Sequence, residues 1–159
     1  MANDQVQSFT GARPRLTVAA IAERNGRFLV VEERTATGAL VINQPAGHVE
    51  HGETLLEAVS REAFEETAWR FTPELLVGVY LWKHPGGQSS YVRVSFAGAV
   101  DEHDPESPLD EGIERALWLS RDELAAQAER LRSPMVLRTI DDYLAGERYP
   151  LTVLKSLLS

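Results

Sequence analysis

One short segment of this 159-residue chain limits its possible folds more than any other, because it joins a helix signal to an acidic cluster. Thr54 and Glu57 have the spacing of a capping box, and the stretch to about position 69 holds good or neutral helix formers until its end. At about 100° per residue, the apolar stripe that begins with Leu55 and Val59 runs into three carboxylates on one narrow face. These are Glu62, Glu65 and Glu66. A solvated face does not usually continue a buried one, so the pattern argues against three side chains that simply point at water.

The three carboxylates allow two interpretations. As ordinary helix formers they would be solvated, which is the common case for a Glu-rich helix. Like charges at these spacings cost roughly 0.2 to 0.5 kcal/mol per pair, and the helix dipole disfavours anions near a C-terminus. Arg61 can reach Glu65, but one guanidinium cannot neutralise three carboxylates. A hard divalent cation with oxygen ligands can, and Mg²⁺ is the usual choice for substrates that carry phosphate. Spacing alone leaves both interpretations open.

Composition excludes several classes of protein. The chain has no cysteine, so disulfide scaffolds, thiolate metal sites and a cysteine nucleophile are ruled out. Its formal charge of -8 repels nucleic acid and anionic lipid, and an acidic protein that handles anions would need a metal. No apolar run approaches the roughly 20 residues of a spanning helix, and the polar N-terminus lacks the apolar core of a signal peptide. We therefore expect a cytoplasmic protein that contacts neither membrane nor nucleic acid.

The rest of the chain predicts one α/β domain of the α+β kind, with a mixed sheet and a few helices on its faces. Asn25-Gly26 and Gly86-Gly87 are turn signals between apolar runs and predict two hairpins. Residues 1–13 are expected to be a loose terminus and 14–159 the single domain. The expected strands are 15–23, 27–33, 39–43, 75–82, 90–100 and 116–119, the expected later helices are 122–131 and 134–145, and loops are expected over 44–53 and the acidic stretch 101–114.

The segment that contains the carboxylates resembles the Nudix box. Gly47 is followed after five residues by Glu53, and after seven more by the run REAFEETAW at 61–69. Six of the glycine or polar positions that define the box are present, namely Gly47, Glu53, Arg61, Glu62, Glu65 and Glu66. Ala63, Ala68 and Trp69 depart from the pattern, and Ala68 replaces a glycine that normally ends the helix in a left-handed conformation. We expect the helix either to run on to Arg70 or to end with slight strain at the alanine.

The resemblance implies an α/β/α sandwich and hydrolysis of phosphoanhydrides with Mg²⁺, for which Mn²⁺ can substitute. It implies that Glu62, Glu65 and Glu66 are metal ligands, together with the backbone carbonyl of Ala46. Glu62 would also be the general base, although in relatives that role can fall on a glutamate from a later loop. Arg61 would orient the carboxylates, and Glu53 would fix the preceding loop by pairing with Arg61. In some relatives a late loop supplies a further carboxylate, for which the candidates here are Asp110, Glu111 and Glu114, with Glu111 taken as the ligand.

Two further segments, QPAGHVE at 44–50 and LRSP…Y…GERYPL near the C-terminus, resemble the NudJ-type branch of small bacterial phosphatases. This implies nucleoside di- and triphosphates and thiamine-pathway pyrophosphates as substrates, hydroxymethylpyrimidine pyrophosphate among them, with release of orthophosphate. Candidate substrate-binding residues are Gln44, Arg93 and Trp82. Arg93 could equally be an exposed strand arginine, and plain packing is the stronger interpretation of Trp82. We expect a monomer, with a homodimer as the alternative.

Other interpretations concern the loop histidines and the class of protein. His48 and His51 flank Glu50, but without thiolates or a third imidazole a zinc site is disfavoured. A Nudix-like binding or regulatory module would have lost box carboxylates, whereas this chain keeps all of them. An RNA-directed pyrophosphohydrolase would be expected to have a basic surface, which the net charge argues against.

Overall fold

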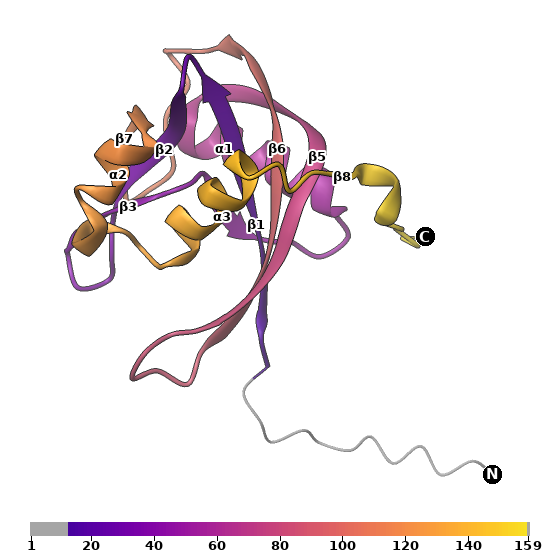
Figure 1. Ribbon diagram of the computed structural model, residues 1–159, viewed down its shortest axis with the longest axis horizontal. Coiled ribbons are helices and arrows are strands. Elements are labelled where there is room, and N and C mark those ends of the chain that lie inside the picture. The colour runs from indigo at the N-terminus through magenta and orange to yellow at the C-terminus, as the bar shows by residue number, and fades with distance from the viewer. Residues whose placement is uncertain (1–12, 159) are drawn as a thin grey trace.

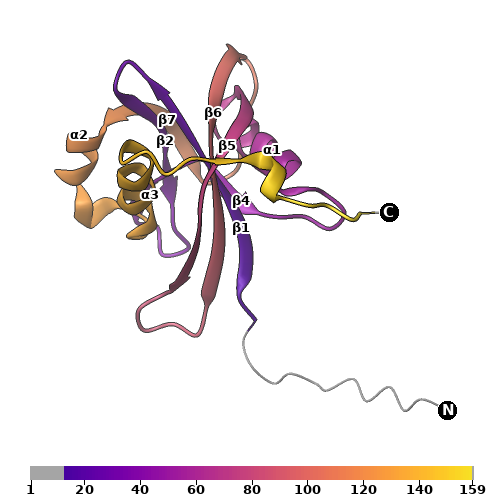
Figure 2. The ribbon, with the colours of Figure 1, turned by 45° about the vertical axis from the view of Figure 1, so that its right-hand side comes forward.

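The computed structural model describes residues 13–158, which form strands covered by helices on two sides. Figure 2 shows α1 on one side of the strands and α2 and α3 on the other. The elements follow one another along the chain in Figure 1. The strands are β1 (Arg15–Arg24), β2 (Arg27–Arg34), β3 (Leu40–Asn43), β4 (Ala46–His48), β5 (Trp69–Lys83), β6 (Ser90–His103), β7 (Ile113–Ser120) and β8 (Tyr149–Pro150). The helices are α1 (Leu55–Thr67), α2 (Arg121–Ala125) and α3 (Met135–Leu144), and short 3₁₀ turns lie at Ala128–Arg130 and Leu151–Val153.

The sheet has the strand order β3-β2-β1-β6-β5-β8, with β4 paired to β1 and β7 paired to β2. β1 and β6 run parallel, whereas the other pairs are antiparallel. The hairpin of β1 and β2 turns at Asn25 and Gly26, which both have positive φ, at 53° and 73°. The two strands pair only next to this turn, at Glu23–Phe28 and Arg24–Arg27. They then separate, and β4 pairs with β1 along Thr17–Ala19. The separation brings the chain around Gly47 beside the first strand.

Both faces of the central strands β1 and β2 are buried, which explains the long apolar runs in these segments. Val18 to Ala22 of β1 are all at most 2% exposed. One cluster packs between the strands and α1 and includes Val59 and Phe96, whereas a second lies toward α2 and α3 and includes Leu124 and Ile140. The predicted sandwich of helices around a mixed sheet is confirmed.

Helix α1 begins and ends as its local sequence directs. The Thr54 hydroxyl accepts a hydrogen bond from the Glu57 N–H, and the Glu57 carboxylate accepts one from the Thr54 N–H, so the capping box is formed. The helix does not run on to Arg70. Ala68 ends it in a left-handed conformation, with φ of 57° and its N–H donating to the Phe64 carbonyl at 2.8 Å. The second expected outcome, a regular end with slight strain at alanine, is the one observed.

Several boundaries differ from those expected. β4 lies in a segment predicted to be only a loop, because its three residues pair with β1 and show no periodicity of their own. β5 begins at Trp69 and continues through Pro73, with three register shifts that accommodate the proline and other irregular positions. β6 extends to His103, into the stretch predicted to be a loop.

The helices after the last long strand are shorter than predicted. α2 ends at Ala125, and a separate 3₁₀ turn takes up part of the expected range. α3 begins one residue later than predicted, although the Ser133 hydroxyl still accepts a hydrogen bond from the Met135 N–H. Gly146 follows α3 with φ of 93°, as expected for a residue just past a helix. The loose terminus at 1–13 falls almost wholly outside the described residues.

Candidate active site

The acidic end of α1 lies against β4, and the contact requires the glycine of the box. A Cβ atom on Gly47 would lie 2.0 Å from the carboxyl carbon of Glu62, so any side chain there would displace that carboxylate. The N–H of Ala46 donates to Glu66 Oε2 at 3.0 Å. Ala46 and Gly47 are therefore the backbone on which the two buried carboxylates of the helix rest.

Arg61 links the carboxylates to the loop before the helix. Its guanidinium bonds Glu53 at 2.6 and 3.0 Å, Glu62 at 2.9 Å and Glu65 at 3.0 Å. It also donates to the carbonyl of His48 at 3.0 Å. The hydrogen bonds from Arg61 hold the pKa of Glu53 below its ordinary value, and those carboxylates raise the pKa of Arg61. The predicted Glu53–Arg61 pair is present.

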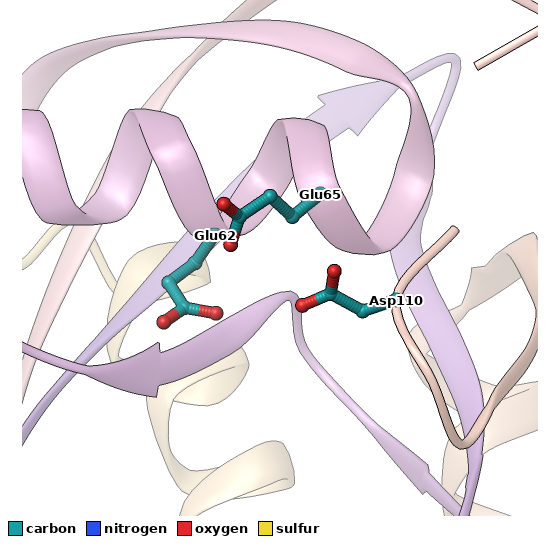
Figure 3. Close-up of side chains that lie close together, drawn as sticks. All are labelled: Glu62, Glu65 and Asp110. Atoms are coloured by element: carbon teal, nitrogen blue, oxygen red, sulfur yellow. The ribbon is translucent and has the colours of Figure 1, made fainter. Parts of the chain in front are cut away.

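A loop before β7 brings one further carboxylate to this place (Figure 3). Oxygen atoms of Glu62, Glu65 and Asp110 lie within 4.8 Å of one another. Asp110 is fixed there because its N–H donates to the carbonyl of Glu65 at 2.9 Å. Glu111 is exposed and outside this group, and Glu114 pairs with an arginine of β2. The geometry therefore favours Asp110 over Glu111 as the late-loop carboxylate, because the backbone bond places Asp110 beside the helix.

Burial decides which interpretation of the helix carboxylates holds. Glu62 is 8% and Glu66 is 7% exposed, so a solvated acidic face is wrong for these two, while the Glu65 side chain is 39% exposed. Burial raises the pKa of Glu62, although Arg61 opposes the shift. Burial raises the pKa of Glu66 to about 9, and the nearby acids Glu33, Glu62 and Asp110 add to the effect. Burial and mutual repulsion disfavour the charged form of these carboxylates, and a divalent cation of the Mg²⁺ type, which prefers hard oxygen ligands, would offset both effects.

A cavity of about 570 Å³ is lined in part by β4, whose Ala46 and Gly47 also contact the carboxylates of Glu66 and Glu62. Arg93, Asn43 and Glu33 line it from three different strands. Arg93 is only 6% exposed, so the interpretation as an exposed strand arginine is wrong. Its neighbours Glu33 and Asn43 were not singled out in the sequence, because nothing local distinguishes them from other strand residues.

Two aromatic rings and the amide of Gln44 complete the surroundings of this cavity. Trp82 lines it and stacks on Tyr91, with ring centroids 5.8 Å apart and planes inclined by 29°. His48, the exposed last residue of β4, also lines the cavity. His84 is the other histidine among the lining residues at 13–158. Gln44 is 1% exposed and is absent from the lining, so the structure places it behind Arg93 instead of in contact with a ligand.

Comparison with known proteins identifies this arrangement. A family model described as the NUDIX domain matches residues 13–139. The chain belongs to the Nudix hydrolase family. Phosphatase NudJ of Escherichia coli (strain K12) is 40% identical over 142 residues, which cover 89% of this chain and 91% of that protein. The same values hold for Phosphatase NudJ of Shigella flexneri.

Solved structures agree with this assignment. A NUDIX hydrolase from Nitrosomonas europaea is 45% identical with a TM-score of 0.89, and the match covers 91% of this chain and 97% of that one. The MutT NUDIX hydrolase from Burkholderia pseudomallei shares the fold, with a TM-score of 0.70 at 22% identity, over 82% of this chain and 98% of that one. The resemblance inferred from the box is thereby confirmed. Within residues 13–158, none of the helices has the length and apolar character needed to cross a membrane.

Proposed function

We propose that this Nudix hydrolase removes the terminal phosphate of nucleoside di- and triphosphates and of related small pyrophosphates in a Mg²⁺-dependent reaction. The observation that carries the proposal is the meeting of Glu62, Glu65 and Asp110 beside a β4 backbone that also lines a cavity with a buried arginine. The curated relatives are named phosphatases, which supports release of orthophosphate. Hydroxymethylpyrimidine pyrophosphate and thiamine pyrophosphate fall within this substrate class.

The acidic residues would hold the metal. Glu62, Glu65 and Asp110 would supply carboxylate oxygens from one cluster. Glu66 and the carbonyl of Ala46 would add further ligands, since the Ala46 N–H already holds Glu66 beside β4. When bound, divalent ions neutralise phosphate oxygens and lower the pKa of a bound water. Arg61 would orient these ligands through its bonds to Glu62 and Glu65, and Glu53 would hold Arg61 in place.

Glu62 is the proposed general base. Its carboxylate is buried against Gly47, and burial raises its pKa, which makes the ionised carboxylate a stronger proton acceptor. A water oxygen bonds to the terminal phosphorus and gives its proton to Glu62, while the bridging P–O bond breaks. The bridging oxygen stays on the phosphate of the leaving group, so orthophosphate and a shortened nucleotide are the products.

The deciding experiment is orthophosphate release across a panel of nucleotides and thiamine-pathway pyrophosphates, with Mg²⁺, with Mn²⁺ and with excess EDTA. We expect turnover with either metal at millimolar concentration and none in EDTA. Glu102→Gln, which changes a surface acid far more exposed than the site residues, serves as the control variant. Full turnover in EDTA contradicts the metal assignment. If the compounds of the panel bind without being hydrolysed, the proposed hydrolase activity is contradicted and the alternative of a Nudix-like binding module is supported.

A further inference from the structure

The cavity beside the carboxylates is positively charged, although the protein as a whole carries a formal charge of -8. Among the lining residues of the described chain, the charged side chains are Arg15, Arg93, Arg132 and Glu33. Glu33 lies 3.5 Å from Arg132. Within the described residues neither Arg15 nor Arg93 makes an ion pair within 4.0 Å, and Arg93 feels the charges of Glu33 and Glu66 only at longer range. A cationic hollow in an acidic protein attracts an anion.

Arg93 is the unusual member of this set. It is 6% exposed, and its Nη1 donates to the neutral amide oxygens of Gln44 at 3.2 Å and Asn43 at 3.5 Å. Within residues 13–158, its Nε has no hydrogen-bond partner and the guanidinium makes no ion pair within 4.0 Å. Burial lowers the pKa of Arg93 to about 10. A buried cation that lacks a carboxylate partner is destabilising unless a bound anion compensates it.

Gln44 orients Arg93 through helix α3. Its Nε2 donates to the Val136 carbonyl and to the Thr139 hydroxyl, each at 3.0 Å. The Val136 carbonyl can only accept, and the Thr139 hydroxyl already donates to the Met135 carbonyl. The amide nitrogen must therefore face the helix, and the amide oxygen must face Arg93.

We propose that Arg93 is an anion anchor, positioned by Gln44, for the phosphate that stays on the leaving group. The proposal rests on the proposed function, because it assigns the other end of the same substrate. Gly47 lines the cavity together with Arg93 and also contacts Glu62, so a phosphoanhydride anchored on Arg93 and lying across Gly47 would present its terminal phosphate to the carboxylates. The stacked Trp82 and Tyr91 offer an aromatic wall to a ring on the leaving group. The favoured substrates then combine a phosphoanhydride with an aromatic ring.

Binding to the metal-free protein isolates this anchor from the catalytic carboxylates. In excess EDTA the carboxylates repel anions, so a phosphate that binds must use the cavity. The probes are inorganic phosphate, inorganic pyrophosphate and the four common 5′-nucleoside monophosphates, followed by tryptophan fluorescence and thermal melting of the full chain. We expect the wild type to bind at least one nucleoside monophosphate, and Arg93→Met and Gln44→Leu to weaken that binding at least about tenfold. Arg70→Met, which removes an exposed arginine paired with Glu102, should bind as the wild type does.

Further variants separate positioning from simple loss of structure. Gln44→Glu places a carboxylate on Arg93 and should weaken phosphate binding even though the arginine remains. With Mg²⁺ and substrate, Gln44→Leu should raise KM more than it lowers kcat. If Arg93→Met does not fold, Arg93→Lys and Gln44→Glu replace it, since both keep a cation in the cavity. Both should still weaken phosphate binding, because lysine lacks the fork of the guanidinium and the new carboxylate occupies Arg93.

The outcomes are distinct. Unchanged binding in the Arg93 and Gln44 variants, or no binding of any probe to the metal-free wild type, overturns the proposal. Inorganic phosphate that binds as tightly as the nucleoside monophosphates overturns the assignment to the leaving group. Anchor-dependent binding without hydrolysis in Mg²⁺ supports the anchor and contradicts the proposed function instead.

Discussion

Glu32 and Glu66 are both buried glutamates, at 4% and 7% exposed, but their surroundings are opposite. The Glu32 carboxylate accepts hydrogen bonds from Arg115 at 2.7 Å and Arg130 at 2.6 Å, and these bonds lower its pKa. Glu66 accepts one bond from the Ala46 N–H and has other acids around it, and burial raises its pKa to about 9.

The difference separates a structural carboxylate from a candidate metal ligand. Two arginines from β7 and the following 3₁₀ turn neutralise Glu32, so that site is complete in the protein alone. Among residues 13–158 no cation pairs with Glu66 within 4.0 Å, and its raised pKa lets the residue stay protonated in the metal-free fold. Buried charge by itself identifies neither role, whereas the partners of that charge do.

The largest expected effect is on catalysis. Glu66→Gln should lower kcat/KM for orthophosphate release by at least about 10²-fold, because an amide keeps the shape but loses the charge that holds the metal. Glu65→Gln should act in the same direction. Glu32→Gln, assayed at a temperature where it is fully folded, should remain within a few-fold of the wild type. Near wild-type turnover of Glu66→Gln would show that this residue is no ligand.

The next effect is on stability. Glu32→Gln should lower the free energy of unfolding by about 1 to 3 kcal/mol, because two guanidinium groups lose a charged acceptor. We expect the lower half of this range, since the Arg115 side chain is 63% exposed and water can solvate its guanidinium once the pair is lost. Urea unfolding in EDTA measures the change. Glu114→Gln, which breaks the exposed pair with Arg34 on the same strands, is the matched control and should cost less than about 1 kcal/mol.

The same comparison predicts opposite pH behaviour. Because its pKa is lowered, Glu32 stabilises the fold above its ordinary pKa of 4.5, and this contribution is lost as the pH falls. A loss of the stability difference between wild type and Glu32→Gln in acid would confirm it.

The smallest effect concerns the metal-free form of the Glu66 variant. Its folded pKa lies above its ordinary 4.5, so the native state holds a proton that the unfolded chain releases, and stability falls as the pH rises from 4.5 toward 9. Glu66→Gln removes this loss and keeps an acceptor for Ala46. It should therefore be as stable as the wild type at pH 5 and more stable by about 1 kcal/mol or more at pH 8.

Thermal melts in EDTA across this pH range measure the Glu66 effect, and excess Mg²⁺ supplies the control. The metal should raise the melting temperature of the wild type by mass action and that of Glu66→Gln much less. If Glu66→Gln is instead less stable than the wild type at pH 8 in EDTA, Glu66 is a structural residue like Glu32. A wild-type melting temperature that ignores the metal would count against the site.

Local features were predictable because they depend on neighbours in the chain. Thr54 and Glu57 cap α1 through bonds that span three residues, and Asn25-Gly26 needs only its own backbone to turn. The helical period also placed the acidic residues on the buried stripe before any contact was known. The three-residue strand β4 was not predicted from the sequence, because it exists only through its pairing with β1.

The sequence by itself determined the family, the helix with its carboxylates, and the need of Gly47 and Arg61 beside them, since the spacing of the box fixes all of these. Only the tertiary structure decided that Asp110, and not its neighbour, joins Glu62 and Glu65. It alone buried Arg93 against Gln44, 49 positions away, and set Glu32 between two arginines. These pairings depend on which strands and loops meet in space, and a charged residue looks the same in a sequence whether its partner is a cation, a ligand or water.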